Sequence, residues 1–284
     1  MMKFDLKNIA SFGVAGNFTG HLEQAGEAAD FVNVKTKEAN APKAVFPTYI
    51  PNGKENVPDY LKIFPFDSKK IIYPVGQTKL QIEPECAVLF SAVWENDEVK
   101  ELKPLGFCAS NDCSIRREGA KKISMKKNWG ECSKGVSDNI IEISSFDENS
   151  VINDYRIASF LVRDKKVFAY GEDSAIKDYS YVYKKLTDWL IEKFNTQKDE
   201  GPAENINSYL ISADKPEKIL VSIGATRYTD YGKENFLANG DHSIVVLYPA
   251  SKYSYEDIVK MVSENNLDDK DISVLDQIVV NNED

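Results

Sequence analysis

The sequence lacks an apolar run of roughly 18 residues or more, so no membrane-spanning helix is expected. It has only two histidines, too few for a zinc site built on imidazole. The four cysteines include no pair at the two-residue spacing of a zinc knuckle. We therefore expect reduced and mostly buried thiols, not a zinc centre, at Cys86, Cys108, Cys113 and Cys132.

The start of the chain lacks a basic stretch followed by an apolar one, so no secretory signal is expected and a cytoplasmic location is the default. Basic residues are in the minority, since 35 Lys and Arg stand against 45 Asp and Glu and give a net charge of −10. Such a chain repels phosphate backbones, so neither nucleic acid nor a membrane is expected as a partner. The acidity is compatible with a bound cation.

Four prolines between residues 35 and 58 predict a long loop there. Before this loop, residues 22–31 are predicted to form a helix. The 284 residues, of which 42% are hydrophobic, are enough for a large core. The chain is therefore compatible with a single domain over residues 1–284. The alternative is a core domain over residues 59–284 on which an N-terminal segment, residues 1–58, packs.

From about residue 60 the pattern is mostly β, with short apolar runs between turn residues. Residues 96–97 and Asp164 are typical of hairpin tips. Helices are expected over residues 179–194, where apolar residues recur at helical spacing, and from Ser254, where a capping box begins. The predicted strands cover residues 80–90, 99–107, 156–162, 166–170, 218–223 and 243–248.

Polar or basic stretches between these elements are expected to be loops. The basic segment 121–134 predicts a solvated loop, and residues 198–207 and 226–241 are polar connections. The acidic tail, residues 268–284, carries a few aliphatic residues and is expected to be partly ordered. Because strands do not alternate regularly with helices, we predict an α+β fold with a mixed sheet and peripheral helices, not a doubly wound sheet.

Two carboxylates, Glu83 and Glu85, lie two residues apart on the predicted strand 80–90, so both side chains point to one face. Two neighbouring carboxylates on an apolar strand need a compensating charge, which a hard cation such as Mg²⁺, Mn²⁺ or Ca²⁺ supplies. Pro84 between them favours an edge or a bulge, where a sheet can aim side chains into a site. The alternative is an exposed strand face without a ligand.

A third carboxylate, Asp112, follows the β-rich run in the sequence Asn-Asp-Cys-Ser. Asn-Asp is typical of turns, and turns beside strand ends are places where ligands are bound. Asp112 therefore becomes the third candidate ligand. The alternative is an Asx-turn with no ligand.

Residues 82–89 read Ile-Glu-Pro-Glu-Cys-Ala-Val-Leu, and residues 111–116 read Asn-Asp-Cys-Ser-Ile-Arg. The two segments resemble the fumarylacetoacetate hydrolase family, in which a strand carries two metal-binding glutamates and an Asn-Asp-Val-Ser-Ala-Arg motif carries the third ligand. A Lys-Gly stretch, a late Leu-x-x-Gly-Asp turn and an early Gly-x-Asn-Tyr-x-x-His segment follow the family order at residues 129–135, 236–241 and 16–21. The resemblance covers roughly residues 10–250.

The resemblance implies a mixed β-roll or β-sandwich, usually a homodimer, that binds Mg²⁺ or Mn²⁺ (or Ca²⁺) through Glu83, Glu85 and Asp112. Family members act on small oxo-acids, and their metal stabilises the negative charge that develops on the substrate. We therefore expect a metal-dependent hydrolase or lyase that carries out C–C cleavage, decarboxylation, hydration or isomerisation of a small oxo-carboxylic acid.

The resemblance also implies roles for other residues. Arg116, Lys134 and Thr226 are the candidates for binding the substrate. His21, together with Glu23 or Glu27, is the candidate for moving the proton. The alternatives are a structural histidine and, for the basic side chains, surface ion pairs.

Three positions depart from the family pattern. The family dyad places a glutamate three residues after the histidine, and this chain has Gln24 there. The glutamine that often follows the motif arginine is Gly119, and the late Gly-Thr-Pro turn reads Gly224-Ala225-Thr226. A second hypothesis is therefore a catalytically reduced relative that binds a small ligand or a protein partner. A third is a purely structural acidic protein.

Overall fold

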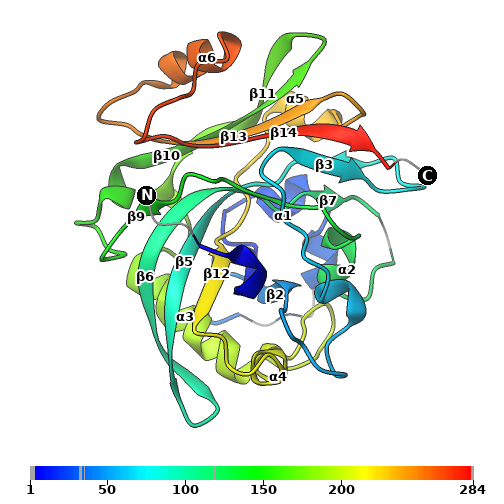
Figure 1. Ribbon diagram of the computed structural model, residues 1–284, viewed down its shortest axis with the longest axis vertical. Coiled ribbons are helices and arrows are strands. Elements are labelled where there is room, and N and C mark those ends of the chain that lie inside the picture. Colours follow the sequence, from blue (N-terminus) through cyan, green and yellow to red (C-terminus); the bar gives the residue numbers. More distant parts are fainter. Residues whose placement is uncertain (1–3, 32–33, 35, 118, 283–284) are drawn as a thin grey trace.

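The computed structural model describes residues 4–31, 34, 36–117 and 119–282 (Figure 1). Its larger sheet curls, and seven strands in this described part form it, in the order β2-β1-β12-β5-β6-β8 with β9 also paired to β6. These strands are β1 (Ala10–Ala15), β2 (Ala44–Tyr49), β5 (Pro84–Glu95), β6 (Glu98–Asn111), β8 (Gly135–Val136), β9 (Ile141–Glu142) and β12 (Lys218–Ser222).

A second sheet lies across the first, with β13 and β14 next to β5 and β6 (Figure 1). Its strand order is β11-β10-β13-β14-β3. The strands are β3 (Lys70–Tyr73), β10 (Tyr155–Arg163), β11 (Lys166–Ala175), β13 (His242–Pro249) and β14 (Ser273–Asn281). A short antiparallel pair consists of β4 (Leu80–Gln81) and β7 (Ser114–Ile115).

Short helices surround the sheets, which confirms the predicted α+β class. None of the helices in the described residues is long and apolar enough to cross a bilayer. The α-helices are α1 (His21–Gln24), α2 (Ser124–Lys127), α3 (Tyr183–Thr196), α4 (Ile206–Ser212), α5 (Asp230–Glu234) and α6 (Tyr255–Ser263). The 3-10 turns are η1 (Leu6–Asn8), η2 (Ala28–Phe31), η3 (Asp59–Leu61), η4 (Val151–Asp154) and η5 (Ile176–Asp178).

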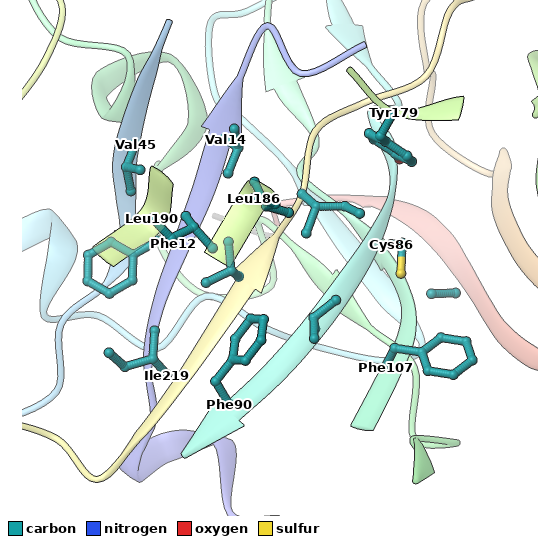
Figure 2. Packing of buried hydrophobic residues seen from close by; sticks show 14 of the residues in the cluster. Phe12, Val14, Val45, Cys86, Phe90, Phe107, Tyr179, Leu186, Leu190 and Ile219 are labelled. Carbon is teal, nitrogen blue, oxygen red and sulfur yellow. The ribbon is translucent and has the colours of Figure 1, made fainter. Parts of the chain in front are cut away.

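Part of the main core lies between α3 and one face of the larger sheet, and the same cluster continues into the second sheet. Figure 2 shows Leu186 and Leu190 of α3 next to Phe12 of β1 and Ile219 of β12. Because apolar residues three and four apart share one face of a helix, the predicted periodicity buries this face of α3. The helix begins at Tyr183, four residues later than predicted, after the turn η5.

Several predicted elements are confirmed. Strands β5 and β6 form a hairpin whose tip includes Asn96 at φ 54°, and β10 pairs with β11 around Asp164 at φ 51°. Strands β12 and β13 lie where the sequence predicts them. Helix α6 begins after Ser254 with both hydrogen bonds of a capping box.

The loop predicted over residues 35–58 is wrong in part, because β2 lies within it (residue 35 itself lies outside the described part). Pro47 is tolerated because β2 is the edge strand and its pairing with β1 has a bulge there. The amide of Gln197 further protects this edge, since its Oε1 accepts from Val45 N at 2.9 Å and its Nε2 donates to Val45 O at 2.7 Å. The N-terminal segment 1–58 thus contributes two strands to the larger sheet.

Two further expectations need correction, those for residues 22–31 and for the polar connections, whereas the partly ordered acidic tail is confirmed. The predicted helix 22–31 ends at Gln24, because Gly26 adopts a left-handed φ of 70°. The acidic tail contains β14, which pairs with both β13 and β3. Residues 283–284 lie outside the described part. The polar connections 198–207 and 226–241 include the start of α4 and the whole of α5.

Leu190→Ala tests the packing of α3. Leu190 is fully buried in the main core, so its removal leaves a cavity. We expect the free energy of unfolding, measured by urea denaturation, to fall by about 3 kcal/mol. The control Val151→Ala removes two methyl groups from a residue that is 56% exposed. We expect it to change the free energy of unfolding by no more than about 0.5 kcal/mol. Equal effects of the two substitutions would contradict this assignment of the core.

Candidate functional site

Glu83, Glu85 and Asp112 form one buried cluster, with one oxygen from each side chain within 4.8 Å of the others. The three residues are 3%, 1% and 2% exposed. The predicted strand 80–90 is interrupted, because β4 ends at Gln81 and β5 begins at Pro84. Glu83 therefore lies in the break and not on the strand. The cluster forms although the predicted continuous strand is wrong.

The Asn-Asp pair at the end of β6 holds Glu83 in place. Asn111 Oδ1 accepts from Glu83 N at 3.1 Å, and Asp112 N donates to Glu83 O at 3.1 Å. Asn111 Nδ2 donates to Ser243 Oγ and Gln277 Oε1 of the second sheet, at 3.1 and 3.2 Å. Buried polar groups must be paired, so this network fixes the backbone that carries two of the three carboxylates.

The cluster includes a lysine that the sequence places in a loop. The prediction of a solvated loop over residues 121–134 is wrong, because Lys127 ends α2 and its side chain is 3% exposed. Its Nζ lies 2.6 Å from Glu83 Oε2 and 2.7 Å from Asp112 Oδ2. It also donates to Ser114 Oγ at 2.8 Å. A buried charge needs such partners, and the carboxylates supply them.

Lys134 and Arg116 supply two further positive charges. Lys134 Nζ lies 2.6 Å from Asp112 Oδ1, and burial lowers its pKa although Asp112 opposes this. Arg116 lies 2.8 Å from Glu83 Oε1 through one terminal nitrogen and 2.8 Å from Glu27 Oε1 through the other. Burial disfavours the charge of Glu83, but Lys127 and Arg116 outweigh it and hold the pKa of Glu83 well below its ordinary value.

Glu85 differs from the other two carboxylates. Its Oε2 accepts from Gly224 N at 2.8 Å, and within the described residues no cationic side chain forms an ion pair with it. Burial, and then the nearby charges of Asp112 and Glu83, raise the pKa of Glu85 well above its ordinary value. Gly224 has φ 117° and a Cβ there would lie 3.1 Å from Asn17 Cβ, so this turn requires glycine.

His21 is buried beside the cluster and bonded to Thr226. Its Nδ1 lies 2.8 Å from Thr226 O, and because a carbonyl oxygen only accepts, Nδ1 carries the hydrogen. Nε2 is then the nitrogen with a lone pair. Burial lowers the pKa of His21, against the opposing charge of Glu83. Thr226 thus positions the imidazole through its backbone.

Gln24, at the position where the family dyad has a glutamate, bonds to the backbone of Tyr228. Its Oε1 accepts from Tyr228 N at 2.8 Å and its Nε2 donates to Tyr228 O at 3.3 Å. Glu23 is exposed, so the structure does not bring it into the cluster. Glu27 is buried, because Gly26 ends α1 in a Schellman motif in which Glu27 N donates to Leu22 O at 2.9 Å.

A cavity of about 310 Å³ opens beside Arg116 and Glu27. Glu27 is the only acidic residue in its described lining, which therefore suits an anionic ligand. Arg116 connects the cavity to the cluster, since it contacts both Glu27 and Glu83. The basic residues of the lining are Lys79, Arg116, Arg117, Lys126 and Lys233.

The sequence analysis missed Lys127, Gln81 and Tyr228. Gln81 Oε1 accepts from Arg116 Nε at 2.6 Å, and the Tyr228 hydroxyl lies 2.7 Å from Arg116. No motif marks these residues. One argument could have pointed to Lys127: three buried carboxylates need positive partners, and the basic segment 121–134 is nearby in sequence.

Comparison with known proteins places the chain in a family. A model for a family of unknown function, DUF5718, matches residues 27–279. The chain belongs to this family. No curated protein matches it in sequence.

Solved structures share its fold. A 2-keto-3-deoxy-D-arabinonate dehydratase complexed with magnesium and 2,5-dioxopentanoate has a TM-score of 0.58 at 14% identity, over 98% of this chain and 75% of that one. A 5-carboxymethyl-2-hydroxymuconate delta-isomerase from Mycobacterium smegmatis has a TM-score of 0.53 at 12% identity, over 97% and 80%. These neighbours confirm, for the fold, the resemblance to the fumarylacetoacetate hydrolase superfamily.

The residues of the cluster fit a hard divalent ion by donor type and spacing. Three carboxylates that each offer one oxygen within 4.8 Å of the others form an oxygen ligand set of the kind that Mg²⁺, Mn²⁺ and Ca²⁺ prefer. Glu85 adds a buried carboxylate without an ion-pair partner in the described part of the chain. The cluster therefore could bind a divalent metal.

Helix α2, which carries Lys127, is anchored by Glu204. Ser124 at its start donates to Glu204 Oε1 and lies 3.0 Å from the Tyr60 hydroxyl. Burial raises the pKa of Glu204 to about 7, although its bond from Ser124 opposes the rise. The carboxyl group at the base of α2 therefore changes its charge near neutral pH.

This shift predicts a pH dependence of stability. The pKa of Glu204 rises from 4.5 to about 7 on folding, so its contribution is fully present below pH 4.5 and is lost as the pH rises through 7. We expect the free energy of unfolding to fall by about 3 kcal/mol more in the wild type than in Glu204→Gln between pH 5 and 8. Urea denaturation at several pH values measures this. Glu200→Gln, an exposed site in the same loop, is the control, and parallel curves for wild type and Glu204→Gln would refute the prediction.

Proposed function

We propose that the protein is a divalent-metal-dependent hydrolase or lyase that acts on a small oxo-carboxylic acid. The observation that carries this proposal is the buried cluster of Glu83, Glu85 and Asp112, with oxygens within 4.8 Å of one another. The named activities of fold neighbours, a dehydratase and an isomerase of small acids, support the same class. A cytoplasmic homodimer remains part of the proposal.

The three carboxylates would hold Mg²⁺ or Mn²⁺. When bound, such an ion acts as a Lewis acid that stabilises negative charge on an oxo-acid. One fold neighbour is complexed with magnesium and 2,5-dioxopentanoate.

In this proposal the other residues of the cluster bind or orient the substrate, or they move a proton. Lys134 is the candidate for contact with a substrate oxygen, and burial, which lowers its pKa, makes it a more ready proton donor. His21 Nε2 is the candidate proton acceptor, because Thr226 O binds the hydrogen on Nδ1 and fixes the tautomer. Glu27 is the better candidate than Glu23 for influence on His21, since it is buried and the charge of Glu27 acts to raise the pKa of His21.

Substrate entry is proposed through the cavity beside Arg116. Its basic lining attracts a carboxylate, and desolvation there strengthens the attraction. Arg116 already pairs with Glu27 and Glu83, so binding a substrate carboxylate requires it to exchange one of these partners. Substrate binding would then also change the ion pairs that Arg116 makes with Glu27 and Glu83 beside the cluster.

A second candidate is a relative that binds an oxo-acid without turning it over. The observation that favours it is Gln24, whose amide bonds to both the N and the O of Tyr228 and supplies no carboxylate to His21. Both candidates predict ligand-dependent stabilisation, because a ligand that binds the folded state raises its stability. Only the first predicts turnover.

Glu85→Gln separates metal binding from folding. Because Glu85 has no ion-pair partner in the described residues and its raised pKa favours the neutral form, a neutral amide of the same shape preserves the metal-free protein. We expect 1 mM Mn²⁺ to raise the wild-type Tm by several degrees, on the order of 2 kcal/mol of linkage, and to leave Glu85→Gln nearly unchanged. Differential scanning fluorimetry measures both shifts.

The matched control is Glu98→Gln, which removes an exposed carboxylate from β6. We expect it to retain the full wild-type shift. An undiminished shift in Glu85→Gln would rule out the cluster as the metal site.

Turnover distinguishes the two candidates. We expect protein that is stripped of metal and then supplied with Mg²⁺ or Mn²⁺ to consume an acylpyruvate, oxaloacetate or a related oxo-acid. The loss of the substrate's ultraviolet absorbance measures this turnover. Glu85→Gln should lower kcat by roughly a hundredfold or more, because it weakens the stabilisation of developing charge. Stabilisation by these acids without turnover would support the binding candidate.

A further inference from the structure

We propose that Lys127 is the resident cation of the carboxylate cluster and that a divalent ion binds there only by displacing its ammonium. The inference rests on the proposed metal site but assigns a new role to a residue outside the family motifs. In this account Lys127 keeps the metal-free site intact and sets the affinity for the ion.

Oxygens surround the Lys127 ammonium. A lysine ammonium has three hydrogens, and Lys127 Nζ has three oxygens at 2.6, 2.7 and 2.8 Å: Glu83 Oε2, Asp112 Oδ2 and Ser114 Oγ. The ring of Phe46 lies 5.0 Å from Nζ and adds a cation–π contact. Two of these three oxygens belong to carboxylates, so the geometry is that of an ammonium paired with two negative charges.

Each carboxylate oxygen of Glu83 and Asp112 pairs with a cationic side chain. Lys127 contacts one oxygen of Glu83 and one of Asp112, and among the cationic side chains that the structure describes it is the one that pairs with both. The remaining oxygen of Glu83 is paired with Arg116 and that of Asp112 with Lys134. Both oxygens of each side chain thus already pair with a cation, so a divalent ion would have to share an oxygen with a positive charge.

Of the three cationic side chains, Lys127 occupies the place that a divalent ion would take. An ion bound by all three carboxylates must lie between Glu83 and Asp112, where Lys127 Nζ already bridges them. In the described ion pairs, Arg116 and Lys134 each pair with one of these two carboxylates, at the oxygen that Lys127 does not contact. A divalent ion repels an ammonium that shares its oxygens, so the bridging Lys127 is the group that must leave.

The experiment compares Mn²⁺ affinity in variants of the full chain. Lys127→Met keeps the length of the side chain and removes its charge, and Lys127→Gln is the second neutral variant in case the first does not fold. Lys121→Met makes the same change at an exposed position of the same segment and is the matched control. Free Mn²⁺ is counted by electron paramagnetic resonance during titration of metal-stripped protein, which gives Kd without any assay of activity.

We expect both Lys127 variants to bind Mn²⁺ at least about tenfold more tightly than the wild type, because the competing charge is gone. Lys121→Met should match the wild type. If the wild type binds Mn²⁺ and neither Lys127 variant binds it more tightly, the inference fails and the proposed metal site stands. If neither the wild type nor any variant binds Mn²⁺, both the inference and the metal-dependent function fail.

Discussion

The structure depends on the pairing of buried carboxylates with buried cations. Glu83 and Asp112 are almost fully removed from water, and an unpaired charge there would cost several kcal/mol. Lys127, which bridges them, is equally buried and has the same need. Neither side is stable at this depth alone, so the cluster and the segment that carries Lys127 must form together.

The fold brings these groups from distant parts of the chain to one place. Glu85 lies near the start of β5 and Asp112 just after the end of its partner β6, so one antiparallel hairpin presents two of the carboxylates. Asn111 ties Glu83 to this pair and extends the network to the second sheet. The turn after β12 adds the backbone of Gly224, and α1 adds His21. The site therefore lies where the two sheets meet, beside the segment that follows β1.

Much of the scaffold was predictable because local patterns decide it. The hairpins, the apolar face of α3 and the capping box at Ser254 depend on residues close in sequence. The carboxylate cluster was predictable because the motif order indicates a family whose fold brings these motifs together. The spacing argument alone placed Glu83 on a strand, and the structure places it in a break.

The rest depends on contacts that no local pattern contains. The segment 121–134 has the composition of a solvated loop, and only its distant partners Glu83 and Asp112 make burial of Lys127 favourable. Pro47 argues against a strand until the edge position of β2 and the partner Gln197 are known. Glu27 lies far from the site in a continuous helix and close to it once Gly26 turns the chain.

We propose two states of the site that share one set of oxygens: the state seen here, with the Lys127 ammonium, and one with a divalent ion. The fold neighbour complexed with magnesium is similar in fold at 14% identity, which leaves the residues around the carboxylates free to differ. The difference of interest is therefore what occupies the space between Glu83 and Asp112 in this chain.

The most direct test is an anomalous difference map from crystals of the wild-type protein grown with Mn²⁺. The account predicts one strong peak within coordinating distance, about 2.2 Å, of oxygens from Glu83, Glu85 and Asp112, with the Lys127 ammonium withdrawn from both carboxylates. A map with no peak at these three residues, in protein that binds Mn²⁺ in solution, would contradict the central claim that the cluster is a cation site.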